Sequence, residues 1–281
     1  MGLRGVFWAL GLAIVFLAAL LASQRPFRVY PSIEPYDDVP LPPDWQNKSE
    51  MVFARLMYPP HPFIGLFTAP RRRHSFDWTE GNSSWTEDYP RADRHFLQAL
   101  RRLTRVDTRS VEQPVNLDDG DDVFNYPFLY VAMPGSWDLT PAQVEKLREY
   151  LLRGGFLMAD DFWGTEECAN FESGIEKVLP GRPIVELPDA EPIFHTVYDL
   201  DDRYQIPGEW ATRFGRSYRS DGTVAHWRGI YDDKGRLLVA ICLNSDTGDS
   251  WEFADEPSYP EKYSALGIRL GVNFVIYAMT H

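Results

Sequence analysis

Two adjacent aspartates, Asp160 and Asp161, end a short apolar run and are the first residues of this sequence that could do chemistry. Paired carboxylates can act as general acid and base, or can bind a ligand that carries hydrogen-bond donors. The alternative is structural, because acidic residues at the end of a strand often only cap the next turn or helix. A chemical role therefore requires partners from elsewhere in the chain.

Three other segments offer such partners. The first runs from Trp85 to Asp93, the second is His195, and the third runs from Asn244 to Trp251. His195 has no cysteine or second histidine at ligand spacing, so we interpret it as a structural histidine, with a catalytic role as the alternative. Together with two residues further upstream, these segments supply the ligand-binding candidates Arg55, Tyr58, Trp85, Asp88, Asp93, Asn244, Asp246, Asp249 and Trp251.

The third segment follows directly from an apolar run and places Asn244, Asp246 and Asp249 in one loop. Such oxygen ligands suit a hard cation or a hydroxyl-rich molecule, but their spacing is not that of the calcium-binding loop. Turn formation explains the same pattern equally well. We therefore predict no metal and no cofactor, and the catalytic residues stay unknown, with Asp160, Asp161 and His195 as candidates.

The segment before the paired aspartates predicts the elements that position them. Thr140 and Gln143 form a capping box for a helix over 141–153, which Gly154 can end in the left-handed conformation. Apolar runs at 128–133 and 156–159 flank this helix and indicate buried strands. A strand, a helix and a strand predict two neighbouring parallel strands, and ligands bind at the carboxyl ends of such strands.

Further elements follow from the same patterns. We predict strand character over 51–58, a helix opened by Pro90, a hairpin over 225–243, and a last helix over 264–281 whose glycines approach the sheet. The segment with Asp160 and Asp161 and the segment with Asn244 and Asp246 each leave a buried strand. We therefore predict that Asp160 or Asp161 shares a pocket with Asn244 or Asp246, where mutual repulsion raises a carboxylate pKa.

The composition fits one sizeable folded domain, because 44% of the 281 residues are hydrophobic. The net charge of -13 excludes the class of nucleic-acid binders, which need a basic face. The basic run Arg71-Arg72-Arg73-His74 is interpreted as a solvated loop, with an anion or lipid headgroup contact as the alternative.

An apolar run from Gly5 to Ala22 is long enough to span a bilayer and lacks a clean cleavage site. We predict a transmembrane anchor or signal sequence over 1–23, with the anchor preferred, a proline-rich tether over 24–50, and a domain over 51–281. The protein is expected in the bacterial inner membrane, as a single-pass protein whose soluble domain is periplasmic.

The sequence has two cysteines, Cys168 and Cys242. Cys242 lies in an apolar run and is interpreted as a buried strand residue. Cys168 is expected in a loop and could be a nucleophile, although no glycine elbow surrounds it. The sequence leaves open whether the two are bonded to each other.

From Met51 to the C-terminus, several short motifs occur in an order that resembles the bacterial family called domain of unknown function 4159. They are Phe53-Ala-Arg55-Leu-x-Tyr58, Trp85-x-x-Asp88-Tyr-Pro90-x-x-Asp93, Tyr126-Pro-Phe-Leu-Tyr130, Leu147-Arg-x-Tyr150-Leu-x-x-Gly154-Gly-Phe-Leu-x-x-Asp160-Asp161, Pro192-Ile-Phe-His195, Asn244-x-Asp246 and Leu270-Gly-Val-Asn273-Phe-Val-Ile-Tyr277-Ala.

The resemblance implies an α/β fold with a mostly parallel, flavodoxin-like sheet flanked by helices, similar to class I glutamine amidotransferases. In that fold a Gly-x-Cys-x-Gly elbow follows the strand that here ends in Asp160 and Asp161. This sequence lacks the elbow, and Cys168 is several residues too late, which argues against glutamine hydrolysis by a thiolate.

We therefore expect a membrane-anchored envelope protein whose domain binds a small polar or glycan-like ligand without catalysis. The faces of Trp85 and Trp251 suit sugar rings, although tryptophans more often pack in a core. One alternative is a hydrolase that uses Asp160 or Asp161 as general base with His195. The other is an envelope assembly subunit with protein partners, which an exposed apolar patch would indicate.

Overall fold

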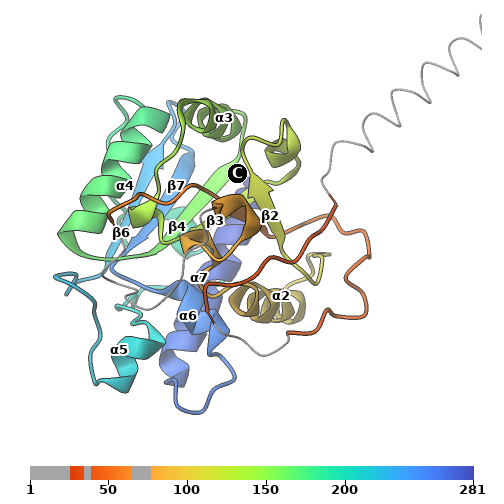
Figure 1. Cartoon of the computed structure of the whole chain (residues 1–281). Helices are drawn as coiled ribbons and strands as arrows, with labels where there is room; N and C mark the ends of the chain where they lie inside the picture. The colour runs from red at the N-terminus through yellow and green to blue at the C-terminus, as the bar shows by residue number, and fades with distance from the viewer. Residues whose placement is uncertain (1–25, 35–38, 65–76) are drawn as a thin grey trace, which may run out of the picture.

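A computed structural model describes residues 26–34, 39–64 and 77–281 (Figure 1). Its centre is a seven-stranded sheet with the strand order β2-β1-β3-β4-β7-β6-β5. The strands β2, β1, β3, β4 and β7 run parallel to one another, whereas β6 pairs antiparallel with β7 and β5 pairs antiparallel with β6. The strands span Ala54–Met57 (β1), Gln113–Asn116 (β2), Phe128–Ala132 (β3), Phe156–Phe162 (β4), Val185–Glu186 (β5), His226–Tyr231 (β6) and Leu237–Leu243 (β7). The predicted α/β class with a mostly parallel sheet is confirmed.

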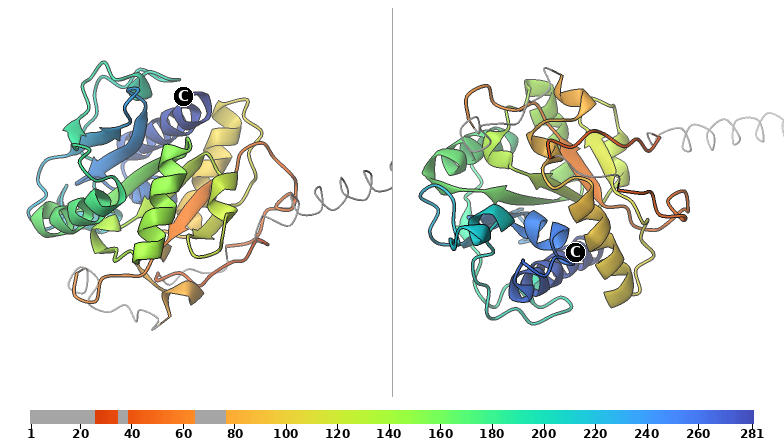
Figure 2. Two further views of the ribbon diagram at one scale, coloured as in Figure 1. Left: turned by 90° about the horizontal axis from the view of Figure 1, so that it is seen from above. Right: turned by 60° about the horizontal axis from the view of Figure 1, so that its bottom comes forward.

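Helices cover both faces of this sheet (Figure 2). The α-helices are α2 (Arg91–Leu103), α3 (Pro141–Leu152), α4 (Gly164–Val178), α5 (Glu209–Arg213), α6 (Thr247–Glu252) and α7 (Glu261–Thr280). Short 3-10 helices are η1 (Trp78–Glu80), η2 (Ser84–Thr86), η3 (Asp122–Asn125), η4 (Pro134–Ser136) and η5 (Pro192–Phe194).

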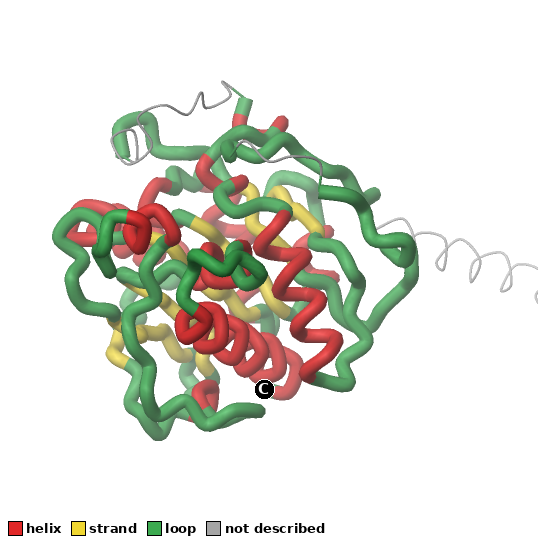
Figure 3. The backbone as a smooth tube through the Cα atoms, turned by 90° about the horizontal axis from the view of Figure 1, so that it is seen from below, coloured by secondary structure: helices red, strands yellow, loops and turns green. Residues whose placement is uncertain are grey.

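The two faces have separate apolar cores. Leu147 of α3 and Phe171 of α4 pack on one face. Phe96 of α2, Trp251 of α6 and Leu270 of α7 pack on the other, where Figure 3 shows α2 and α7 in front of the sheet. The sheet is therefore buried on both sides, as parallel strands require.

The predicted strand, helix and strand around α3 are confirmed. β3 and β4 pair in parallel, with Phe128 opposite Phe156, and α3 lies between them in the chain. Thr140 caps α3, since its side chain accepts from the Gln143 N–H and the Gln143 side chain accepts from the Thr140 N–H. Gly154 adopts a φ of 117°, which a side chain would oppose.

The predicted hairpin and C-terminal helix are also present. β6 and β7 pair antiparallel, and α7 buries Leu266 and Leu270. The glycines of α7 approach other helices, which corrects the prediction that they approach the sheet. A Cβ at Gly267 would lie 1.8 Å from Ser250 Oγ of α6, and one at Gly271 would lie 2.5 Å from the Phe96 ring of α2.

Three further details differ from the sequence prediction. β4 continues to Phe162, so Asp160 and Asp161 lie inside the strand, because both carboxylates find partners in the interior. Cys168 lies on α4, since the helix begins directly after the strand, at Gly164. The short strand β2 was not predicted, because Gln113–Asn116 contains a proline and is polar at both ends.

The described part of the predicted tether packs on the domain. Ser32 Oγ donates to the Thr86 carbonyl, and the Ile33 N–H donates to Thr86 Oγ1. Further along, Arg94 donates to the Val39 carbonyl at 2.8 Å. These residues lie beside the loop that follows β1.

The apolar run from Gly5 to Ala22 and the basic run 71–74 lie outside the described residues. In the described parts of the chain, no helix combines the length and the apolar character needed to cross a bilayer.

Candidate functional site

Five aspartates from distant parts of the sequence meet at the carboxyl edge of the parallel strands. Asp160 and Asp161 come from β4, Asp246 and Asp249 follow β7, and Asp88 lies in the long connection after β1. Four of them are at most 3% exposed, and the fifth, Asp249, is partly exposed. We call these five residues the carboxylate cluster.

Asp160 joins β4 to the start of α6. Its carboxylate accepts hydrogen bonds from the Thr247 N–H at 3.2 Å, from the Gly248 N–H at 2.9 Å and from the Tyr130 hydroxyl at 3.0 Å. Burial, helped by the neighbouring Asp161 and opposed by the hydrogen bonds, raises the pKa of Asp160 to about 7. These bonds give Asp160 a positioning role for α6.

Asp161 adopts a φ of 53° and turns its side chain toward Arg219 and Trp163. Its Oδ1 accepts from Trp163 Nε1 at 2.8 Å and lies 3.2 Å from an Arg219 nitrogen. Burial raises its pKa, and Arg219 lowers it. The Asp161 N–H also donates to the Ser245 carbonyl at 3.2 Å, so the segments that hold Asp161 and Asp246 do approach each other.

Asp246 and Asp249 lie on the loop and first turn of α6. Asp246 Oδ1 accepts from the Asp249 N–H at 2.8 Å, which caps the helix, and Asp249 Oδ2 accepts from the Glu209 N–H. Burial raises the pKa of both carboxyls. The negative charge of Asp161 raises the pKa of Asp246 further, and that of Glu34 raises the pKa of Asp249, because like charges disfavour ionisation.

Asp88 completes the cluster from the opposite side. It adopts a φ of 61°, its N–H donates to Glu34 at 2.9 Å, and burial followed by Asp249 raises its pKa well above the usual range. Its Oδ2 accepts no hydrogen bond from any described residue. A Cβ at Gly248 would lie only 2.2 Å from this oxygen, so the close approach of Asp88 requires glycine there.

Arg55 and Asp93 position the connection that carries Asp88. Arg55 forms two hydrogen bonds to Asp93, at 2.6 and 2.9 Å, and donates to the carbonyls of Trp85 and Glu87 at 3.1 and 3.0 Å. Arg55, Asp93 and Trp85 are buried and Glu87 is partly buried, so Arg55 fixes the backbone just before Asp88.

Tyr58 and Asn244 have comparable positioning roles. The Tyr58 hydroxyl lies 2.8 and 2.9 Å from the carbonyls of Ala132 and Met133. Asn244, with a φ of 61°, accepts from the Gly164 N–H at 2.8 Å and donates to the Val224 carbonyl at 2.7 Å. It therefore links the end of β7 to the start of α4.

The two candidate tryptophans pack in the interior. Trp85 donates to the Trp78 carbonyl at 2.8 Å, and Trp251 stacks on Phe96 with a centroid distance of 4.4 Å. Both side chains are fully buried, which leaves no ring face for a sugar in this structure.

His195 follows η5 and has its own partners. Its ring nitrogens lie 2.8 Å from Asp199 Oδ1 and 2.7 Å from the Asp189 carbonyl. Among the described contacts, none joins His195 to Asp160 or Asp161.

The sequence interpretation missed several residues of this edge. Arg219, Glu34 and Glu252 lie in segments without a recognisable motif, and only long-range packing brings them here. Gly248 could have been noticed, because it stands between Asp246 and Asp249 where a loop becomes a helix.

Two groups of oxygens have the geometry to hold a cation. One oxygen each from Asp88, Asp246 and Asp249 lie within 4.8 Å of one another, and the same holds for Glu34, Asp88 and Glu252. Asp88 belongs to both groups.

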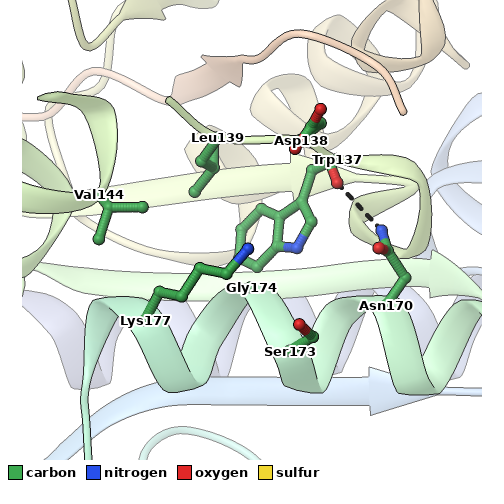
Figure 4. Close-up of a pocket in the computed structure, with 8 residues that line it drawn as sticks. All are labelled: Trp137, Asp138, Leu139, Val144, Asn170, Ser173, Gly174 and Lys177. Atoms are coloured by element: carbon green, nitrogen blue, oxygen red, sulfur yellow. Dashed lines mark hydrogen bonds between the residues drawn. The ribbon is translucent and has the colours of Figure 1, made fainter. Parts of the chain in front are cut away.

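A separate small pocket lies between α4 and the segment that connects η4 with α3 (Figure 4). The indole of Trp137 lines it and packs against Gly174, where a Cβ would lie 2.3 Å from Trp137 Nε1. Asn170 donates to the Trp137 carbonyl at 3.0 Å. This pocket contains none of the candidate residues.

The cysteines of the chain are both free. Cys242 is buried in β7, as predicted. Burial and Glu172 raise the pKa of Cys168 to about 11, which is the opposite of what a reactive thiolate needs.

A family model described as Domain of unknown function (DUF4159) matches residues 75–279. The chain belongs to this family. The match covers all five residues of the carboxylate cluster, while β1 lies before it. A comparison of this DUF4159 protein with curated proteins finds no match.

Proposed function

We propose that this DUF4159 domain binds a small ligand that carries positive charge or several hydrogen-bond donors, without catalysing a reaction on it. The observation that supports this is the carboxylate cluster. Burying carboxyl groups costs stability, and groups with raised pKa values, as all five have, concentrate at functional sites.

The backbone supports the same location. Met133, Asp161, Asn244 and Asp88 all adopt left-handed φ values, between 48° and 61°, and lie at the ends of β3, β4 and β7 or after β1. Non-glycine residues in this region cost energy and cluster at ligand sites, because folding alone does not require them.

We also propose that the domain has a flavodoxin-like fold, which the strand order supports. The five parallel strands follow one another in the order of a flavodoxin-like sheet, in which ligands bind at the carboxyl edge. The likeness to class I glutamine amidotransferases is proposed for the fold only, since no cysteine elbow follows β4 and Cys168 lies on α4.

We further propose that the apolar run from Gly5 to Ala22 keeps the protein in the bacterial inner membrane with this domain in the periplasm. The length of the run supports this proposal. Fractionation tests it, because a mature protein that begins after Ala22 and stays in the soluble fraction would contradict it.

Thermal denaturation of the full chain in mild detergent tests ligand binding. The probes are spermidine, glucosamine, a neutral disaccharide and a divalent cation, each measured on the native sequence and on Asp249→Asn. A ligand at a hundred times its Kd adds about 2.7 kcal/mol, or roughly 5–10 °C for a domain of this size.

Asp202→Asn serves as the control, because Asp202 is exposed. We expect at least one probe to raise the melting temperature of the native protein and of the control, and to lose this effect in Asp249→Asn. If none of the probes does so, the proposed function is wrong.

The hydrolase alternative has weaker support. Asp160 has a pKa close to neutrality, as a general base requires, but it is fully buried and all its described bonds hold α6 and Tyr130. We therefore assign Asp160 to positioning.

One observation favours an envelope assembly role as a second candidate. Trp210 and Phe214 are 59% and 64% exposed, and their rings lie 4.9 Å apart on α5 and the residue after it. Exposed aromatic pairs of this kind are typical of protein contact surfaces. Replacing both by serine should abolish any oligomer that chemical cross-linking detects, and an unchanged oligomer would exclude this surface.

A further inference from the structure

The ligand of the carboxylate cluster can be specified from the positions of three of its members. We propose that Asp88, Asp246 and Asp249 bind one hard divalent cation, of the Ca²⁺ and Mg²⁺ class. This inference rests on the proposed function, because it names the ligand of the same site.

The distances between the three carboxylates fit an ion. Their closest oxygens lie within 4.8 Å of one another, so a common centre lies at most about 2.8 Å from each. Calcium binds oxygen at about 2.3–2.6 Å, and magnesium at about 2.0–2.1 Å. A small inward movement of the side chains is enough for coordination.

The unpartnered oxygens point to a ligand independently of the cluster itself. Asp88 is 1% exposed, and its Oδ2 accepts no hydrogen bond from any described residue. The hydroxyl of Thr247, between Asp246 and Asp249 in sequence, is also buried without a described partner. Leaving such a group unsatisfied in the interior costs about 1–3 kcal/mol, and more when it is charged. A cation would satisfy the Asp88 oxygen.

The two buried arginines near the three residues form their ion pairs with other aspartates. Arg219 forms its ion pair with Asp161, and Arg55 forms its ion pair with Asp93. Among the described residues, no Lys or Arg forms an ion pair with any of the three proposed ligands.

A divalent cation would compensate these three carboxylates, which bind metals in the deprotonated form.

Glycines let the backbone approach the same oxygens. A Cβ at Gly208 would lie 2.7 Å from Asp246 Oδ2 and 3.0 Å from Asp249 Oδ2. Gly248 has the same role beside Asp88. The three ligands are therefore held close together by packing that larger residues would disrupt.

The ligand chemistry selects the class of ion. All three side chains offer carboxylate oxygens, which suit calcium, magnesium and manganese, and the described neighbours include no cysteine or histidine ligand in this group. Asp249 is partly exposed, so an ion could enter beside it and keep some of its water.

Terbium luminescence tests the proposal on the full chain in mild detergent, after treatment with a chelator and its removal. Terbium replaces calcium at oxygen sites and is excited through nearby tryptophan, and Trp163 donates to Asp161 beside the cluster. We expect saturable luminescence with one ion per chain, which Ca²⁺ or Mg²⁺ displaces.

The variants are Asp88→Asn, Asp249→Asn and the exposed control Asp202→Asn. Asparagine tolerates the left-handed backbone of Asp88, so folding should be kept, and circular dichroism verifies it. We expect each ligand variant to weaken binding at least tenfold and the control to match the native protein.

Two results would overturn the inference: no saturable binding to the native protein, or binding that both folded ligand variants retain. If either variant fails to fold, calorimetric titration of the native protein with Ca²⁺ and Mg²⁺ still tests the site. The site is refuted if these ions give no binding heat and do not displace terbium. If cations fail but spermidine or glucosamine gives stabilisation that depends on Asp249, only this inference is wrong and the proposed function stands.

Discussion

The buried carboxyl of Asp160 should make the stability of the domain fall as the pH rises. Burial raises its pKa from 3.8 to about 7 in the folded protein, while the unfolded chain keeps the ordinary value. Between these values the folded protein binds a proton that the unfolded chain has lost. The free energy of unfolding therefore decreases with pH in this range.

The size of the effect follows from the two pKa values. One pKa unit corresponds to about 1.4 kcal/mol, so titration of Asp160 from pH 5 to pH 8 removes about 3 kcal/mol. The stabilisation is fully present below pH 3.8, the unfolded pKa, and is lost as the pH rises through about 7.

The substitution Asp160→Asn removes this titration. The amide cannot accept all three hydrogen bonds from Thr247, Gly248 and Tyr130, so the variant loses about 1–3 kcal/mol at every pH. We expect it to be less stable than the native protein at pH 5. By pH 8 the difference should approach zero or change sign, because the native protein has by then lost its own contribution.

Urea denaturation at pH 5, 6, 7 and 8 with a chelator, followed by tryptophan fluorescence, measures the difference. Comparing the two proteins cancels groups that Asp160 does not affect, such as His195, whose raised pKa also reduces stability as the pH rises. The exposed control Asp202→Asn should run parallel to the native protein. A difference between Asp160→Asn and the native protein that stays constant or widens with pH would refute the reasoning.

Two further substitutions test the packing that positions the cluster. Arg55→Met leaves Asp93 buried without its partner and should lower the free energy of unfolding by about 3–5 kcal/mol in urea, whereas Arg101→Met, at an exposed ion pair, should cost less than about 1 kcal/mol. Equal losses would contradict the structural role of Arg55. Gly267→Ala places a Cβ against Ser250 of α6 and should cost about 1–3 kcal/mol in the same assay, and Ser250→Gly in the same chain should restore part of it. Without any restoration, the contact between α6 and α7 is not the cause.

Local signals in the sequence were enough for much of the fold. The capping box of Thr140 and Gln143 marks α3, and the apolar runs on either side predict the parallel pair β3 and β4. The hairpin of β6 and β7 follows from its turn residues. These features depend on neighbours within a few residues, so composition and spacing determine them.

The sequence also indicated part of the candidate site. Asp160, Asp161, Asn244 and Asp246 follow or end buried strands, and strands of one parallel sheet bring their carboxyl ends to one edge. Their approach could therefore be predicted from topology alone. Asp249 belongs to the same loop as Asp246, so it follows as well.

Only the tertiary structure decided what surrounds these residues. Asp88 meets Asp249 because Arg55 fixes the connection after β1 and Gly248 leaves room for the carboxylate, and neither contact has a local signal in the sequence. For the same reason spacing could not decide the role of Trp251, which the structure buries against Phe96. Sequence pattern determines which residues end a strand, whereas burial, charge compensation and pKa depend on segments far apart in the chain, and these become neighbours only when the two cores form on the sheet.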